Sequence, residues 1–143
     1  MAEPVCDTPR VLLDPEAIVQ EHLRALVEGL RQRNLEGVLS LFDERAVLFG
    51  SEAGERAIGR AELASFFGRL FAEPRTVGWE WNSLHVGSAG DVSWFVGPAM
   101  VVVRTEDGAE QRLPYRLSGV LCRDLDGRWR FAQFNGAEPA GAA

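Results

Sequence analysis

The last third of the chain constrains the fold most strongly. Residues 113–139 hold two long segments in which apolar and polar side chains alternate, joined by Asp-Leu-Asp-Gly at 124–127. A short connection rich in Asp and Gly between two such segments is typical of an antiparallel hairpin. Similar turns separate two further segments upstream, so the pattern predicts an antiparallel meander. Its strands are expected at residues 76–86, 92–104, 111–123 and 128–135.

The first half of the chain has the apolar spacing of helices. Asp14 and Pro15 form an N-cap and a first turn. Apolar residues then recur three or four positions apart from Val19 to Leu30, which predicts a long first helix ending near Asn34. The other expected elements are a short helix at 35–42, a strand at 46–49, a loop at 50–59 and a third helix at 60–72.

Composition limits the classes of function. The chain has 143 residues, enough for one domain, which we expect at 14–138 between a loose arm at 1–13 and a disordered tail at 139–143. The formal net charge is −6, and all 15 basic residues are arginine. Without lysine the chain cannot form a lysine Schiff base. An acidic chain with dispersed arginines also lacks the basic patch of a nucleic-acid-binding protein.

Cysteine and histidine usage argues against a metal or a disulfide framework. Cys6 and Cys122 are too few for such a framework, and His22 and His85 have no partner at the spacing of metal ligands. We therefore expect no metal and no cofactor. No apolar run reaches the ~18 residues of a membrane-spanning helix, and the N-terminus lacks the pattern of a signal peptide. A cytoplasmic protein without a membrane partner is expected.

Three helices followed by a meander favour an α+β fold, in which a strongly curved antiparallel sheet wraps around the first helix. Gly97 and Pro98 interrupt the second strand of the meander. Because proline cannot donate a hydrogen bond to a central ladder, this pair is expected to mark a bulge or bend that helps the sheet to curve.

Four segments carry a resemblance to a known family. They are Asn-Leu-Glu-Gly-Val-Leu-Ser-Leu-Phe-Asp at 34–43 with Ala46-Val47, Gly-Arg-Ala-Glu-Leu at 59–63, Gly-Asp-Val-Ser-Trp at 90–94, and Asp-Gly-Arg-Trp-Arg-Phe-Ala-Gln-Phe-Asn at 126–135. In this order they resemble the nuclear transport factor 2-like superfamily, in particular its SnoaL-like branch. The resemblance implies a cone-shaped fold with three N-terminal helices packed on the curved antiparallel sheet. It implies no single function, because superfamily members include isomerases, cyclases, dehydratases, transport adaptors and oligomerisation domains.

Ketosteroid isomerase is one relative of this shape. It needs an Asp base, together with a Tyr and a protonated Asp that stabilise the enolate oxygen. The resemblance puts the base at Gly50 or Ser51, the Tyr near Leu26 and the protonated Asp near Val120. None of these residues carries the required group, so ketosteroid isomerase chemistry is not expected.

The association domain of calcium/calmodulin-dependent kinase is a second relative, whose cone carries several arginines. The resemblance puts Val96, Val120 and Gly136 at those positions. Both comparisons imply a cone lined mainly by apolar groups, and our first hypothesis is a pocket for a small apolar molecule. The residues expected to line it are Leu26, Phe49, Phe66, Phe67, Trp94, Val96, Arg116, Ser118, Val120 and Phe134.

Four side chains are weak candidates for acid–base chemistry. Glu80 could act as a general acid or base if it pointed into the cone, and the alternative is a solvated carboxylate paired with an arginine. Glu52 and Glu55 lie on the loop at the expected mouth of the cone, where solvated loop charges are the alternative. His85 can exchange protons near neutral pH but lies near a strand end, where exposure is expected. Whether the protein is an enzyme stays open.

The second hypothesis is a non-catalytic dimerisation or interaction module whose cone is filled by its own side chains. Exposed aromatic patches on a sheet usually mark an interface, here with a second copy of the chain. Alternation along the last strand puts the expected dimer face at Trp129, Phe131, Gln133 and Asn135.

Overall fold

The computed structural model describes residues 14–141, and the predicted arm at 1–13 and the last two residues of the predicted tail lie outside this range. The helices are α2 (Pro15–Gln32), α3 (Leu35–Leu39) and α4 (Arg60–Ala72). The strands are β1 (Phe42–Phe49), β2 (Arg56–Ile58), β3 (Arg75–Glu80), β4 (His85–Ala89), β5 (Val92–Thr105), β6 (Glu110–Arg123) and β7 (Trp129–Ala137).

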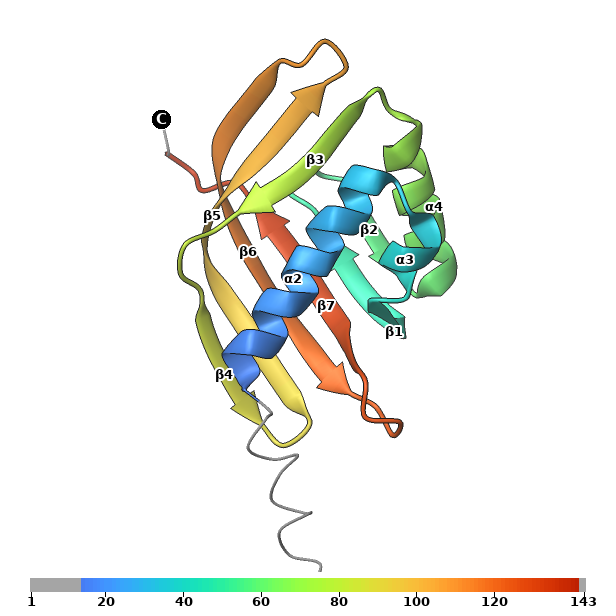
Figure 1. The fold of residues 1–143 in the computed structure, drawn as a ribbon, viewed down its shortest axis with the longest axis vertical. Coiled ribbons are helices and arrows are strands. Elements are labelled where there is room, and N and C mark those ends of the chain that lie inside the picture. Colours follow the sequence, from blue (N-terminus) through green and yellow to red (C-terminus); the bar gives the residue numbers. More distant parts are fainter. Residues whose placement is uncertain (1–13, 142–143) are drawn as a thin grey trace, which may run out of the picture.

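The strands form one curled sheet in the order β2-β1-β7-β6-β5-β3, with β4 also paired to β5. Neighbouring strands are antiparallel except β1 and β7, which run parallel. Helix α2 crosses one face of this sheet, and α3 and α4 lie to one side of it (Figure 1). The predicted α+β cone is confirmed, with a sheet that is mixed because of the one parallel pair.

Helix α2 begins and ends where its local chemistry requires. The side chain of Asp14 accepts a hydrogen bond from the backbone N–H of Glu16 at 3.1 Å. The helix ends at Arg33, whose left-handed backbone (φ 52°) turns the chain away. Asn34 then caps α3 by accepting a hydrogen bond from the N–H of Gly37 at 3.0 Å. The first helix is therefore confirmed, and its predicted end lies within two residues of the observed one.

His22 ties α2 to the last strand. Its Nδ1 lies 2.8 Å from the carbonyl oxygen of Ile18, and its Nε2 lies 2.9 Å from the carbonyl oxygen of Trp129. The imidazole ring also meets the ring of Phe131 edge-on, with centroids 6.1 Å apart. These contacts hold the first half of α2 against β7 and so help to close the cone.

The first strand of the predicted meander is two strands, β3 and β4, separated by residues 81–84. A Cβ at Gly97 would lie 3.2 Å from the carbonyl oxygen of Ser83, so glycine lets the connecting backbone pass close to β5. Strand β5 continues through Gly97 and Pro98 in unbroken register with β6. A bulge at this pair, one of the two predicted options, is therefore wrong, and the interruption lies in the edge strand beside it.

The chain before α4 also contains more strand than predicted. Strand β1 starts at Phe42 instead of Ala46, and the backbone N–H of Phe131 donates to the carbonyl oxygen of Leu41 at 2.7 Å. Residues 56–58, predicted as loop, pair with the end of β1 as β2. The early start of β1 arises from its pairing with β7, far along the chain, which local sequence patterns do not report.

Two of the predicted strand faces are wrong by one residue. On β5 and β6 the inner face holds Phe95, Leu117 and Leu121, all fully buried. Trp94 and Val96 are 43% and 49% exposed on the outer face. Because side chains alternate along a strand, a one-residue error moves every side chain of β5 and β6 to the opposite side of the sheet.

Strand β7 contains a bulge that reverses its alternation. Its register with β6 shifts between Val120 and Leu121, so that Phe131 and Phe134 both face inward although three positions separate them. Phe131 is 0% exposed, and its prediction as a dimer-face residue is therefore wrong. Gln133 is exposed on the outer face, as predicted from the alternation.

Candidate functional site

A cavity of about 240 Å³ lies between α2, α4 and the inner face of the sheet. Leucines from α2 and α4 and aromatic rings from α4, β3, β6 and β7 make up most of its wall. The principal apolar and aromatic lining residues are Leu26, Leu30, Phe66, Phe67, Leu70, Val77, Trp79, Val101, Leu113, Tyr115 and Phe134. The cavity therefore offers a ligand a predominantly apolar and aromatic surface.

Tyr115 brings a polar group into this wall. The side chain is 7% exposed, and its hydroxyl is hydrogen-bonded with Ser51. Burial raises the pKa of Tyr115 because a phenolate would be poorly solvated there, and the hydrogen bond with Ser51 opposes this effect. The nearby carboxylates of Glu55, Glu138 and Glu52 raise the pKa of Tyr115 further. At neutral pH the cavity thus holds a neutral phenol that can donate or accept one hydrogen bond.

The mouth of the cavity is acidic. Glu52 and Glu55 lie on the loop between β1 and β2, and Glu138 follows β7. The Glu55 carboxylate accepts a hydrogen bond from the backbone N–H of Glu52 at 3.0 Å, which holds the loop in place. Arg75 is the one basic side chain among the cavity-lining residues in the described range, and its Nε donates to Glu73 Oε1 at 2.7 Å. Three carboxylate residues therefore line the cavity at exposed or half-buried positions, and the single guanidinium among the described lining residues already has an acidic partner.

Half of the predicted pocket residues line this cavity, and half do not. Those that line it are Leu26, Phe49, Phe66, Phe67 and Phe134. Those that point to the outer face of β5 and β6 are Trp94, Val96, Arg116, Ser118 and Val120. The second group is wrong as a set, because all five rest on the same misplaced alternation.

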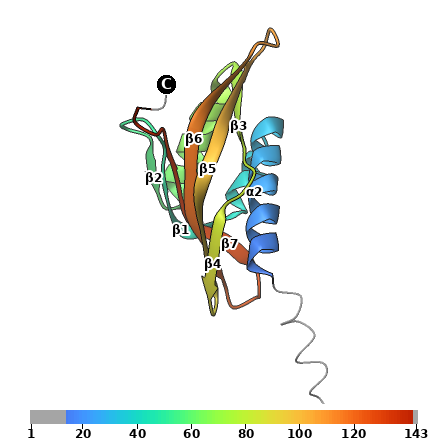
Figure 2. The ribbon, with the colours of Figure 1, turned by 90° about the vertical axis from the view of Figure 1, so that its left-hand side faces the viewer.

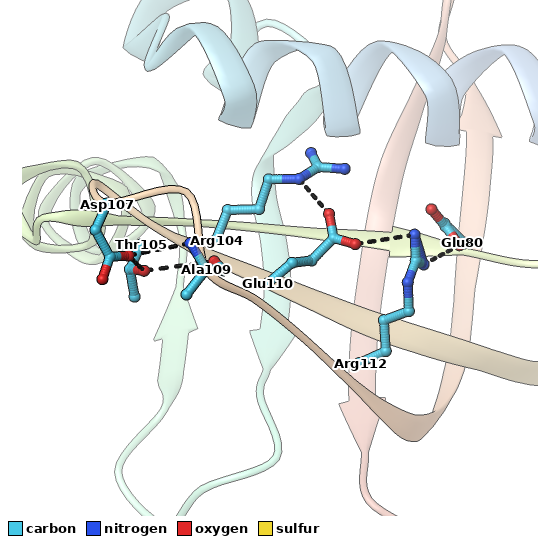
Figure 3. A network of polar contacts seen from close by, with 7 residues as sticks. All are labelled: Glu80, Arg104, Thr105, Asp107, Ala109, Glu110 and Arg112. Atoms are coloured by element: carbon cyan, nitrogen blue, oxygen red, sulfur yellow. Dashed lines mark hydrogen bonds and ion pairs between the residues drawn. The ribbon is translucent and has the colours of Figure 1, made fainter.

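Glu80 lies outside the cone. Its carboxylate is exposed, and Oε1 lies 2.5 Å from Nη1 of Arg112. Arg112 also pairs with Glu110, which in turn pairs with Arg104, so Glu80 ends a chain of ion pairs that joins β3 to β5 and β6 (Figure 3). The structure therefore has the alternative of a solvated carboxylate paired with an arginine, and Glu80 is not among the residues that line the cavity.

The remaining acid–base candidates divide between the mouth and the outer face. Glu52 and Glu55 are at the cavity mouth, whereas His85 is exposed at the start of β4, opposite Val96.

Of the predicted dimer-face residues, Asn135 is on the outer face and donates to Ser118 Oγ at 3.4 Å. Trp129 is partly buried against the core, and the guanidinium carbon of Arg123 lies 5.6 Å from its ring centroid; these two side chains cover one another.

The sequence patterns missed three residues that define the cavity: Trp79, Tyr115 and Glu138. The rings of Trp79 and Tyr115 stack with centroids 6.4 Å apart.

Among residues 14–141 no group of three or more His, Cys, Asp or Glu side chains is arranged to hold a metal ion. No helix in that range combines the length and apolarity needed to cross a membrane.

Several solved structures share this fold at low sequence identity. A ketosteroid isomerase-like protein from Erwinia carotovora atroseptica is 16% identical, with a TM-score of 0.69 over 87% of this chain and 95% of that one. An NTF2-like protein of unknown function from Pseudomonas putida is 16% identical, with a TM-score of 0.72 over 87% and 86%. A protein from Catenulispora acidiphila, solved in complex with S-DNPA, is 19% identical, with a TM-score of 0.73 over 85% and 91%. No curated protein matches the sequence.

A family model extends this likeness from fold to sequence. The model of the SnoaL-like domain matches residues 19–140, a span that runs from the first buried turn of α2 past the end of β7. It includes every element that lines the cavity. The resemblance predicted from the sequence motifs is confirmed, and the chain belongs to the SnoaL-like domain family.

Proposed function

We propose that the protein binds a small, mainly apolar molecule inside its cone. The observation that carries this proposal is the cavity of about 240 Å³ with its aromatic wall. An apolar cavity of about 150 Å³ is large enough to hold benzene. The larger space here suits an aromatic body of one or two rings, held by Trp79, Phe134 and their neighbours. The Catenulispora acidiphila protein of this fold was solved in complex with S-DNPA, which supports the idea that the fold can bind a small molecule.

The alternative of a filled cone is less well supported. Well-packed interiors leave few voids larger than a water molecule, and water occupies about 30 Å³ in the liquid. A cavity of about 240 Å³ exceeds that several-fold. A module that served only to pair subunits would have no use for such a space, and an unfilled cavity in the core costs packing energy.

Binding, and not a particular reaction, is what the polar groups support. By the resemblance, the position of the ketosteroid isomerase base falls at Gly50 or Ser51, and Ser51 is hydrogen-bonded with Tyr115. A neutral serine hydroxyl is too weakly basic to accept a substrate proton as a carboxylate base does. Glu55 is close by, but its carboxylate is engaged by the loop backbone.

We also propose that the protein forms a homodimer through the outer face of β5 and β6. No helix of the described residues lies in front of these strands in Figure 2. Trp94 and Val96 are exposed on that face, which leaves apolar area that a second copy could cover. The test is molar mass by light scattering after size exclusion. We expect a dimer that Val96→Glu converts to a monomer and that Leu125→Glu, at an exposed apolar residue in the β6–β7 turn, leaves intact. A monomeric wild-type protein at all concentrations would refute the dimer.

The binding proposal is tested by isothermal titration with 2-naphthalenemethanol, a neutral probe with a two-ring body. The key variant is Val101→Phe, which fills part of the cavity from β5. The matched control is Val96→Phe, which makes the same change on the outer face of the same strand. We expect Val101→Phe to weaken binding by at least about tenfold, and Val96→Phe to leave it unchanged. Equal affinity in all three proteins, or no binding to the wild type, would contradict the proposal.

A further inference from the structure

We propose that the cavity selects ligands that carry a cationic head, such as a protonated amine, on their apolar body, and that it rejects carboxylates. This inference rests on the proposed function and names the chemical class of the ligand. It depends on how charge is distributed between the wall and the mouth of the cavity. The apolar wall determines which body of the ligand fits, and the charges at the mouth determine which head group is favoured.

The carboxylates come from three separate parts of the mouth. Glu52 and Glu55 come from the loop after β1, and Glu138 comes from the segment after β7. None of the ion pairs among residues 14–141 includes any of the three. A cleft that carries charge of one sign above a wall of low polarity concentrates molecules of the opposite sign at its opening.

The one opposing charge at the cavity is already compensated. Arg75 is bound by Glu73 through its Nε at 2.7 Å, and the backbone carbonyl of Arg75 accepts a hydrogen bond from Arg33 at 3.1 Å. A ligand carboxylate would have to compete with Glu73 for this guanidinium. It would also have to pass Glu52, Glu55 and Glu138, which form no ion pair among the described residues, and like charges brought together in a partly desolvated site repel strongly.

The wall below the mouth also suits a cation. The rings of Trp79 and Tyr115 stack 6.4 Å apart, and the rings of Trp79 and Phe134 lie 5.4 Å apart, so several aromatic faces border one space. A cation within about 6 Å of an aromatic face gains further stabilisation, especially when it is partly desolvated. The neutral phenol of Tyr115 can accept a hydrogen bond from an ammonium group, and the carboxylates around it favour a positive partner.

The experiment compares three probes that share one body and differ in the charge of the head. They are 2-naphthylmethylamine, 2-naphthalenemethanol and 2-naphthoic acid, titrated into the wild-type protein at pH 7 by calorimetry. We expect the amine to bind at least about tenfold more tightly than the acid at low ionic strength, with the alcohol between them. Added salt should reduce this ratio, because the mouth is open to solvent.

Two double variants of equal charge separate the mouth from the net charge of the protein. In the part of the chain that the structure describes, no hydrogen bond is accepted by the carboxylate of Glu52, Glu138, Glu21 or Glu44, so these substitutions leave the local structure intact. Glu52→Gln with Glu138→Gln should reduce the amine-to-acid ratio by about threefold or more. Glu21→Gln with Glu44→Gln, away from the cavity, should leave the ratio unchanged. Val101→Phe should weaken binding of all three probes by at least about tenfold, as expected for ligands held in the cavity.

The outcomes distinguish this inference from the proposed function beneath it. If the alcohol binds in the cavity but the amine binds no more tightly than the acid, the inference is overturned and the proposed function survives. The inference also fails if both double variants lower the ratio equally, because the preference would then reflect only net charge. If none of the three probes binds, both the proposed function and this inference are overturned.

Discussion

Tyr115 on β6 lies directly against the backbone of Gly136 on β7. A Cβ at residue 136 would lie 2.6 Å from Tyr115 Cε2 and would overlap the hydroxyl oxygen. Residue 136 must therefore lack a side chain for the tyrosine ring to occupy its place in the cavity wall. This contact links the closing strand of the cone to the one phenol in the chain, and it makes the position of Tyr115 sensitive to a single methyl group.

Gly136→Ala should destabilise the protein and displace Tyr115. Overpacking a buried site costs about 1–3 kcal/mol, and we expect a loss of unfolding free energy of that size in urea denaturation. The matched control is Gly68→Ala, on the exposed side of α4, where a Cβ would meet no atom within 4 Å. That change should stabilise the protein by about 0.5–1 kcal/mol, because alanine is the better helix former. If both variants behaved alike, the close contact of Tyr115 with Gly136 would be refuted.

Tyr115 should make the protein sensitive to alkali. Burial raises its pKa in the folded state. Below the ordinary tyrosine pKa of about 10 the Tyr115 side chain is neutral in both the folded and the unfolded state, and its contribution to stability is fully present. Above that pH the unfolded state loses its proton first, so stability falls until the folded state also ionises. The chain has a single tyrosine, so the absorbance of tyrosinate reports this residue alone.

The measurement for Tyr115 is the unfolding free energy from about pH 9 to pH 11 for the wild type and Tyr115→Phe. We expect the wild type to lose more stability than the variant across this interval. The absorbance titration of the folded wild type should have its midpoint above the ordinary value of about 10. A midpoint at or below that value would show that the phenol is not buried.

Ser93→Ala should raise stability. Ser93 is 0% exposed on the inner face of β5, and its hydroxyl finds no hydrogen-bond partner among residues 14–141. Removing an unpaired buried hydroxyl should gain about 1 kcal/mol in urea denaturation. The control is Ser40→Ala, because Ser40 Oγ donates to the carbonyl oxygen of Gly37 at 2.7 Å. That variant should lose stability, and a destabilised Ser93→Ala protein would mean that the Ser93 hydroxyl is paired after all.

Glu80→Gln should affect neither binding nor stability strongly. Glu80 and Arg112 form an exposed ion pair, and such pairs contribute about 0–1 kcal/mol. The affinity for 2-naphthalenemethanol should stay within about twofold of the wild type, because Glu80 lies outside the cone. A double-mutant cycle with Arg112→Gln measures the pair directly. A large loss of probe affinity in Glu80→Gln would contradict this prediction and would show that Glu80 belongs to the binding site.

The helices could be predicted well because their signals are local. The cap at Asp14 and the apolar spacing from Val19 to Leu30 lie within one element, and they correctly predicted α2. The third predicted helix, residues 60–72, coincides with α4. Capping and periodicity depend on neighbours a few positions away, which a sequence displays in full.

The faces of the long strands could not be predicted in the same way. On β5 both faces carry large apolar groups, with Trp94 and Val96 outside and Phe95 and Val101 inside, so alternation alone does not distinguish them. The bulge in β7 then reverses the alternation after Phe131, which no local pattern announces. Half of the predicted pocket residues therefore lie on the outer face of the sheet. The same error left Tyr115, on the inner face of β6, out of the predicted pocket.

The parallel pairing of β7 with β1 has a consequence for synthesis of the chain. Strand β7 follows all the other described helices and strands along the chain, yet it occupies a central place between β1 and β6. Before β7 is synthesised, β1 and β6 each present an unpaired edge. Leu41 and Ser118 then lack the residues of β7, Phe131 and Asn135, with which they pair in the complete fold. Such non-local pairing slows folding and leaves partly made chains open to aggregation. A nascent chain that stalls before residue 129 therefore exposes two strand edges that β7 covers in the complete sheet.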